Sequence, residues 1–175
     1  MDPTLWSETA QPVADMLSKL MPAHKAEFDA NAAAFRARAQ ELDAQCAQIL
    51  AQIPQPMREL ISAHDAFHYF GRRFGLEVRA IQGLSTESEA SIADIENLVA
   101  NIAARKIPVA FIETTVSDRT VRALVEGCAS IGHELEIGAP LYSDSLGRLG
   151  TPEGTWEGMM LHNARVIADA LGSGR

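Results

Sequence analysis

Apolar residues recur at helical spacing through the first third of the chain. Residues 1–20 are predicted to form a short lead-in followed by one helix, whose apolar residues recur at helical spacing. The apolar side of this helix consists of Val13, Met16, Leu17 and Leu20. Pro22 suits the first turn of a second helix, because the amide hydrogen that proline lacks would have no partner there.

The second helix is predicted to continue to about Ile53, where Pro54 and Pro56 end it. Its apolar positions alternate at intervals of four and three, at Phe28, Ala32, Phe35, Ala39, Leu42, Cys46, Ile49 and Ile53. At about 1.5 Å per residue, such a helix is a rod of more than roughly 40 Å. A stripe of this length is typical of a coiled coil. Few charge pairs flank its alanine-rich seam, however, which favours a backbone helix that lies across one or two domains.

After Pro56, apolar runs of strand length alternate with helical stripes. The predicted strands cover residues 59–62, 78–81, 109–112 and 135–137, and the predicted helices cover residues 65–74, 91–102, 118–131 and 151–171. Ser91 and Asp94 form a capping-box-like start for one of these helices. Strands that alternate with helices imply a parallel sheet with helices on both faces. The sequence therefore predicts an α/β fold with a small parallel sheet of about four strands, preceded by the long helix.

The composition is that of a soluble globular domain with one core. The chain has 175 residues, of which 47% are hydrophobic and 22% are charged. Its net charge of -8 argues against nucleic acid or an anionic membrane as a partner. No apolar run approaches the roughly 20 residues of a transmembrane helix, and the N-terminus lacks the basic and apolar regions of a signal peptide. Cys46 and Cys128 are expected to be small buried side chains, with a disulfide between them as the alternative.

Candidate chemistry begins at His64, on the predicted turn between the first strand of the sheet and the next helix. Ligands of open α/β sheets collect at the carboxyl ends of the strands, so His64 is a candidate metal ligand or base. The alternative is a capping turn with an incidental histidine. Asp144, in the loop after the last strand, is predicted to lie at the same edge. Imidazole nitrogen and carboxylate oxygen are both good zinc ligands, so the two residues form a candidate metal site.

Other polar groups carry weaker signals. Surface or structural roles are expected for the remaining histidines, His24, His68, His133 and His162. Glu87 and Glu89 are interpreted as solvated loop charges. The chain has neither the Gly-x-Ser-x-Gly turn of a serine hydrolase nor a glycine-rich phosphate loop. A metal-dependent hydrolase that uses His64 and Asp144, with Glu113 as the general base, is a further hypothesis.

Four segments form an ordered series of motifs that resembles a known family. They are residues 62–70 (SAHDAFHYF), 84–91 (LSTESEAS), 141–146 (LYSDSL) and 159–163 (MMLHN). From Asp2 to about Leu171, the chain is similar to the C-terminal part of the zinc/manganese solute-binding proteins of bacterial ABC transporters, a family that includes adhesin-type lipoproteins. The resemblance implies two α/β lobes joined by one long rigid helix, which residues 22–53 match.

In this family the metal lies between the lobes and is held by two ligands from each. The resemblance makes His64 the first ligand from the C-terminal lobe and Asp144 the second, with Zn²⁺ or Mn²⁺ as transported cargo. A carboxylate often stands at the position of His64 in manganese-preferring relatives, so an imidazole there favours zinc. The resemblance also implies an ABC permease as partner, no enzymatic activity, and a periplasmic or extracellular lipoprotein.

Two departures from the family pattern affect the expected metal binding. The family motif Asp-Pro-His-x-Trp reads Asp2-Pro3-Thr4-Leu5-Trp6 here, so Thr4 stands where the family has a ligand. The N-terminal lobe and its first histidine do not precede this motif in the sequence. We expect residues 1–56 to form the N-terminal helix and the linking helix, and residues 57–175 to form the C-terminal lobe. Two protein ligands instead of four predict weakened metal binding.

Two further expectations depend on the same departures. The change at Thr4 supports the alternative of a structural or interaction remnant of the family without a working metal site. Apolar side chains on residues 5–35 are expected to be exposed, among them Trp6, Met16, Leu17, Leu20 and Phe28. Because soluble proteins seldom leave a large apolar patch open, these side chains predict self-association through the N-terminal helices.

Overall fold

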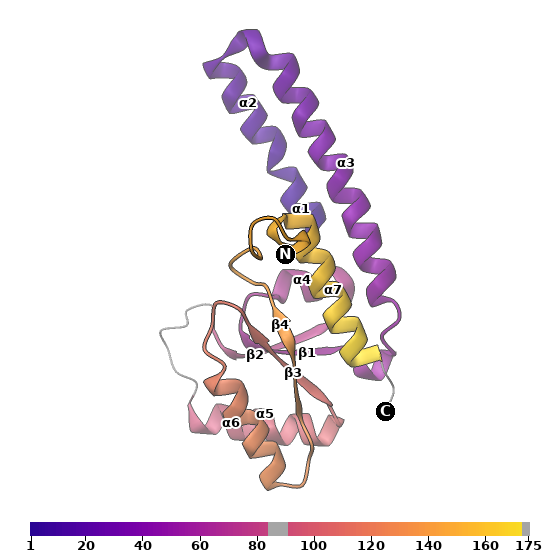
Figure 1. The fold of residues 1–175 in the computed structure, drawn as a ribbon, viewed down its shortest axis with the longest axis vertical. Helices are drawn as coiled ribbons and strands as arrows, with labels where there is room; N and C mark the ends of the chain where they lie inside the picture. Colours follow the sequence, from indigo (N-terminus) through magenta and orange to yellow (C-terminus); the bar gives the residue numbers. More distant parts are fainter. Residues whose placement is uncertain (84–90, 173–175) are drawn as a thin grey trace.

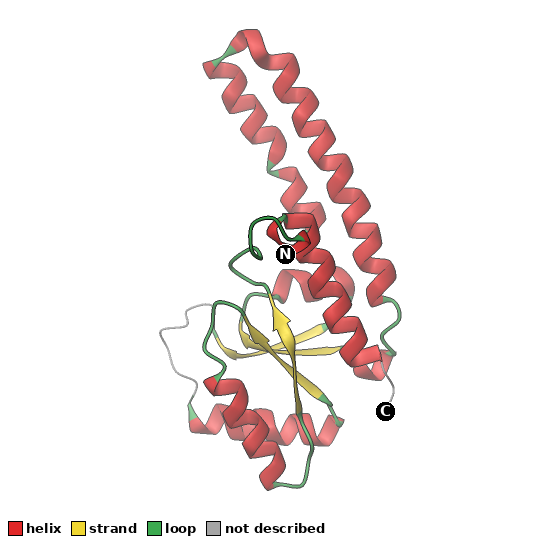
Figure 2. Ribbon diagram, in the orientation of Figure 1, coloured by secondary structure: helices red, strands yellow, loops and turns green. Residues whose placement is uncertain are grey.

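A computed structural model of the protein describes residues 1–83 and 91–172. Its centre is a four-stranded sheet with the order β2-β1-β3-β4, in which every neighbouring pair is parallel (Figure 2). The strands are β1 (Glu59–His64), β2 (Glu77–Gln82), β3 (Val109–Glu113) and β4 (Glu136–Leu141). The predicted α/β fold with a small parallel sheet is therefore confirmed.

Helices cover both faces of the sheet, as the alternating pattern predicts. They are α4 (His68–Phe74), α5 (Ile92–Arg105), α6 (Arg119–Ser130) and α7 (Trp156–Gly172). The helices α5 and α6 lie together on one face, whereas α4 and α7 lie on the other with the end of the long N-terminal helix (Figure 1). Because the strands are parallel, their four carboxyl ends lie at the same edge of the sheet, between the two helix layers.

Each buried strand contributes side chains to two separate cores. Leu60 of β1 packs in the cluster beneath α4 and α7, whereas its neighbour Ile61 packs in the cluster beneath α5 and α6. Phe111 and Ala110 of β3 divide in the same way. Because both faces are covered, these strands appear in the sequence as continuous apolar runs and not as an alternation of apolar and polar residues.

The N-terminal part of the chain forms a helical hairpin that projects away from the sheet (Figure 1). It comprises α1 (Pro3–Glu8), α2 (Ala10–Leu20), the short 3-10 turn η1 (Pro22–His24) and α3 (Lys25–Leu50). The helix predicted after a short lead-in is α2, and the lead-in itself forms the separate helix α1, which the sequence did not predict. The predicted second helix is α3, but both of its ends differ by three residues. Pro22 begins the 3-10 turn η1 instead of the helix, and α3 ends at Leu50 instead of Ile53.

The long helix α3 lies across the molecule. It packs against α1 and α2 in its first half and against α7 further along (Figure 1). This arrangement supports a backbone helix over the coiled-coil alternative. Its predicted stripe is buried at Ala32, Ala39, Leu42 and Cys46. The apolar residues predicted along α2 are exposed at Val13, Met16 and Leu20, and Ala14 is the buried residue of that helix. The expected exposure of Met16 and Leu20 is therefore confirmed.

Several predicted ends of elements differ from the structure by a few residues. A second 3-10 turn, η2 (Gln55–Met57), precedes β1, and a third, η3 (Pro152–Gly154), precedes α7 where a helix start was predicted. The predicted cap of α5 is confirmed, since Ser91 Oγ accepts a hydrogen bond from Asp94 N at 3.2 Å. Ile131, assigned to the apolar stripe of α6, is exposed.

Both cysteines are free and buried, which settles the alternative of a disulfide between them. Burial raises the pKa of the Cys46 thiol to about 12, so the thiol stays protonated at neutral pH. Within the described ranges, no helix is both long enough and apolar enough to cross a membrane.

Candidate metal-binding site

His64 is the last residue of β1, and the prediction that it lies in the following turn was wrong. The strand continues because His64 pairs with Gln82 of β2. After it, Ala66 N donates to His64 O at 3.0 Å and turns the chain toward α4, which begins three residues later than predicted. The side chain of His64 is only 5% exposed. The imidazole is therefore held by a strand at the sheet edge.

Asp144 comes from the loop after β4 and reaches the imidazole from the side of solvent. Its Oδ2 lies 3.2 Å from His64 Nε2, and its side chain is 62% exposed. The predicted meeting of residues 64 and 144 at one edge of the sheet is thus found in the structure. The pair combines one buried nitrogen donor with one accessible oxygen donor, so an incoming ion can reach it from one side only.

Glu113 contacts the other side of the same imidazole. It ends β3, the strand between β1 and β4 in the sheet order. Its Oε1 accepts a hydrogen bond from the His64 main-chain N–H at 3.0 Å, and its Oε2 lies 2.8 Å from His64 Nδ1. This second contact is at ion-pair distance but outside hydrogen-bond geometry. Sequence reasoning placed Glu113 correctly at a strand end but gave it the role of a general base.

The loop that carries Asp144 is held by a buried side chain of α7 to which the sequence analysis gave no role. Asn163 of α7 is fully buried; its Oδ1 accepts from Tyr142 N at 3.0 Å and its Nδ2 donates to Tyr142 O at 2.7 Å. The amide of Asn163 thereby pairs with the main chain just past β4, as a neighbouring strand would. A polar residue within the apolar stripe of a helix was the available signal.

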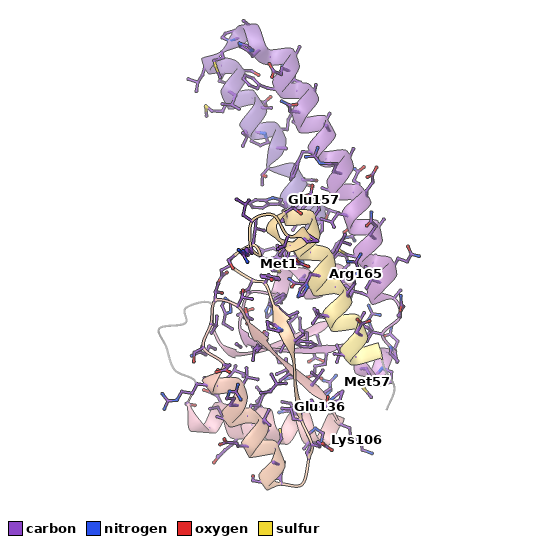
Figure 3. All side chains as sticks on the ribbon, in the orientation of Figure 1. Met1, Met57, Lys106, Glu136, Glu157 and Arg165 are labelled. Carbon is purple, nitrogen blue, oxygen red and sulfur yellow. The ribbon has the colours of Figure 1, made fainter. Side chains whose placement is uncertain are left out.

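A hollow of ≈ 350 Å³ lies beside Asp144, between the loop after β4 and the start of α1. Its walls include Asp2, Trp6 and Trp156, and Met1 lies against the same loop (Figure 3). A second hollow of ≈ 290 Å³ lies between β2 and α5, and no histidine is among its lining residues. The hollow beside Asp144 is therefore the one that adjoins candidate metal donors.

Asp2 has a local structural role at the rim of this hollow. It is the N-cap of α1, and its Oδ1 accepts from Thr4 N at 3.0 Å, Leu5 N at 3.1 Å and Thr4 Oγ1 at 2.6 Å. Burial by itself would raise the pKa of the Asp2 carboxyl, but these hydrogen bonds outweigh it and hold the pKa below its ordinary value. Thr4 thus serves the cap of α1.

The remaining histidines have the surface or structural places expected of them. His24 and His68 are exposed and pair with Glu27 and Asp65 on their own segments. His133 Nε2 lies 2.7 Å from Ile107 O. His162 Nε2 lies 3.1 Å from Pro140 O. The expectation for Glu87 and Glu89 falls outside the described residues.

Among the described residues, the donors at the sheet edge amount to two for a metal ion. In residues 1–83 and 91–172, no group of three or more His, Cys, Asp or Glu side chains is placed to hold a metal. Glu113 does not add a third donor, because its oxygens face Nδ1 and the main chain of His64 while Asp144 faces Nε2. The arrangement can offer an ion Nε2 of His64 and the carboxylate of Asp144.

A buried imidazole and a carboxylate thus meet at the edge of a parallel sheet, and comparison with known proteins identifies the family. Residues 1–170 match the family described as zinc-uptake complex component A, periplasmic. The chain belongs to this family of periplasmic zinc/manganese-binding proteins.

The individual relatives show that the match extends over nearly the whole chain. It is 41% identical over 167 residues to the manganese-binding lipoprotein MntA of Bacillus subtilis, covering 95% of this chain and 55% of the relative. It is 42% identical over 170 residues to the zinc-binding protein TroA of Treponema pallidum, covering 97% and 55%. The chain therefore spans about half the length of the curated relatives it matches.

Solved structures agree with this assignment. The periplasmic zinc-binding protein TroA of Treponema pallidum superimposes with a TM-score of 0.91 at 42% identity, covering 97% of this chain and 61% of that one. The Fe(III)-bound YtgA of Chlamydia trachomatis gives a TM-score of 0.88 at 28% identity, covering 98% and 61%. The names of these proteins include zinc, manganese and iron, so the family assignment alone leaves the ion of this chain open.

Proposed function

We propose that this chain is part of the metal-binding component of an ABC uptake system, with zinc or manganese as the cargo. His64 Nε2 and Asp144 are the proposed ligands. The supporting observation is their separation of 3.2 Å at the carboxyl edge of the sheet. A tetrahedral zinc ion with bonds of about 2.0–2.1 Å keeps two ligand atoms roughly 3.3 Å apart. Little movement is therefore needed to accept the ion, and the imidazole favours zinc over manganese.

The proposal treats the chain as one lobe of the family's two-lobe binding unit. Residues 1–56 supply the N-terminal helices and the linking helix, and residues 57–175 supply the C-terminal lobe. This chain alone supplies two protein ligands, so in the chain by itself water completes the coordination and binding is weaker than in a site with four protein ligands. The protein acts by holding and releasing an ion and not as an enzyme.

The proposed partners follow from the same family role. The lobe would present its cargo to an ABC permease from the periplasmic or outer side of a membrane, as part of a lipoprotein. We also propose that copies of this chain associate through the exposed apolar side chains of α1 and α2, which include Trp6, Met16 and Leu20.

Zinc titration of four proteins tests the proposed ligands. Wild type, His64→Ala and Asp144→Ala are compared by calorimetry and by competition with a chromophoric chelator, with His68→Ala as the matched control. His68 is an exposed histidine four residues from His64 that pairs with Asp65. Loss of either ligand should weaken zinc binding by about tenfold or more, and the control should bind as wild type. Indistinguishable isotherms for wild type and His64→Ala would exclude His64 as a ligand.

Thr4 favours a second candidate function, a structural or interaction module of the family without a working metal site. The residue at the family's histidine position is hydrogen-bonded to the cap of α1 and offers no imidazole. In this case wild type and His64→Ala bind zinc equally weakly. The hydrolase hypothesis has lost its base, because both oxygens of Glu113 face His64 and its side chain is fully buried.

A further inference from the structure

Glu113 is the buried acidic group at the sheet edge that the proposed ligand pair does not use. Its side chain has 0% exposure, and both of its oxygens are directed at one residue, His64. We propose that Glu113 is a positioning residue for the metal site. It keeps a proton on His64 Nδ1 and turns Nε2 toward Asp144 and the ion. This inference rests on the proposed function, since it assigns a role toward the same ion.

The pairing of buried atoms carries the inference. His64 Nδ1 and Glu113 Oε2 are both buried, and neither has a hydrogen-bond partner elsewhere among the described residues. They lie 2.8 Å apart. Buried polar atoms seldom remain unpaired, so each is the natural partner of the other once the ring or the carboxylate rotates slightly. The hydrogen bond from His64 N to Glu113 Oε1 fixes the carboxylate in place for this contact.

The contact decides which nitrogen of His64 can bind a metal ion. A carboxylate accepts hydrogen bonds and cannot donate, so the group facing it on the imidazole must be N–H. With the proton on Nδ1, the lone pair of a neutral ring is on Nε2, the atom that faces Asp144 at 3.2 Å. Carboxylates placed in this way behind a ligating histidine fix its tautomer and the direction of its lone pair.

The substitution Glu113→Gln separates this role from a purely structural one. Glutamine has almost the same shape, and its carbonyl oxygen can still accept the His64 main-chain hydrogen bond. Its amide NH₂ would then face Nδ1 as a donor, which stabilises the opposite tautomer with the proton on Nε2. The fold is kept while the lone pair moves to the wrong nitrogen.

The experiment combines a tautomer measurement with a binding measurement. Nitrogen-15 NMR of histidine-labelled, metal-free protein reports whether His64 Nδ1 carries a proton. The signals of His64 are assigned as those that disappear in the spectrum of His64→Ala. Zinc affinity is measured by chelator competition, and folding by thermal unfolding. We expect Nδ1–H in wild type, its loss in Glu113→Gln, and zinc affinity lower by about 10–100-fold with near-normal unfolding. Asp65→Asn is the control. It also removes one carboxylate charge next to His64, but the carboxylate of Asp65 contacts His68.

Three results would overturn the inference. They are a wild-type Nδ1 without a proton, an unchanged tautomer in Glu113→Gln, or zinc binding in that variant equal to the Asp65→Asn control. The wild-type spectrum does not depend on Glu113→Gln, so it tests the inference even where that variant fails to fold. If His64→Ala also binds zinc as wild type does, the proposed function fails. If His64→Ala loses binding and Glu113→Gln does not, only the role of Glu113 fails.

Discussion

Thr4 lies in the first turn of α1, the helix whose Asp2 and Trp6 line the hollow beside Asp144. The substitution Thr4→His places an imidazole at the position where the family has one. A third protein ligand should raise zinc affinity by about tenfold or more, because it replaces a water on the ion. Chelator competition measures the change.

The matched control is Thr9→His, which adds a histidine at the other end of α1. Thr9 is exposed, and its hydroxyl donates to Trp6 O at 2.7 Å. The Thr9→His protein should bind zinc with the same affinity as wild type. Equal affinities for Thr4→His and Thr9→His would mean that α1 does not present residue 4 to the ion.

The sequence was sufficient for the two proposed ligands but not for the groups that hold them. His64 ends one strand of a parallel sheet and Asp144 follows another, so their common edge could be deduced from the alternation of elements. The contact between Glu113 and His64 depends on β3 lying next to β1, and the strand order is not written in any local pattern. The hydrogen bonds of Asn163 to Tyr142 join residues 21 positions apart in the chain, which the local pattern of α7 does not indicate.

At the scale of single elements, the cap of α1 gives a prediction about stability. Asp2→Ala removes the carboxylate that accepts from Thr4 N and Leu5 N, and should lower the free energy of unfolding by about 0.5–2 kcal/mol at neutral pH. The folded pKa of Asp2 lies below its ordinary value of 3.8. Its contribution is therefore complete above that value and is lost as the pH falls through the lowered folded pKa.

Denaturant unfolding at neutral pH and at about pH 3 measures this linkage. The difference between wild type and Asp2→Ala should shrink at the lower pH. Asp15→Ala is the control, because Asp15 is exposed on α2, where its carboxylate accepts a hydrogen bond from the Gln11 side chain and takes no part in the cap of α1. A difference that stays constant or grows with acid would show that the cap does not depend on the charge of Asp2.

Element types could be predicted more reliably than element ends. Helices and strands after Pro56 differ in period, so each was recognisable from its own residues. Their ends depend on contacts: β1 reaches His64 because Gln82 continues the ladder beside it. At the division of α1 from α2, Thr9 Oγ1 donates to Trp6 O, and at η3, Thr155 Oγ1 donates to Pro152 O. Apolar spacing does not record such local hydrogen bonds.

At the scale of the whole molecule, the hairpin of α2 and α3 differs from the rest because it does not pack on the sheet along most of its length (Figure 1). The lobe buries apolar side chains on both faces of the sheet, whereas α2 packs chiefly against α3, with smaller contacts to η1 and α1, and projects from the lobe (Figure 1). The apolar stripe predicted on α2 is real, but it faces outward because the small residue Ala14 makes the contact with the rest of the protein. The spacing of apolar residues predicts which face of a helix is apolar, but it does not predict whether another part of the protein packs against that face.

This outward face predicts that the protein associates with itself. Val13, Met16 and Leu20 are spaced by three and four residues on one side of α2, and each is more than half exposed. Trp6 on α1 is exposed as well, while Leu17 and Phe28, which were expected to be exposed, are half-buried. Burying such a stripe removes apolar area from water at roughly 25 cal/mol per Å², which favours a dimer at high concentration.

Sedimentation equilibrium over a range of concentrations measures the association. The double variant Met16→Glu/Leu20→Glu places two charges in the stripe and should shift the protein to monomer, because charges buried without partners are costly. Leu149→Glu is the matched control: Leu149 is 93% exposed but lies in the loop before η3. It should associate as wild type does. A wild-type protein that stays monomeric at the highest concentration, or a control as monomeric as the double variant, would exclude α2 as the interface.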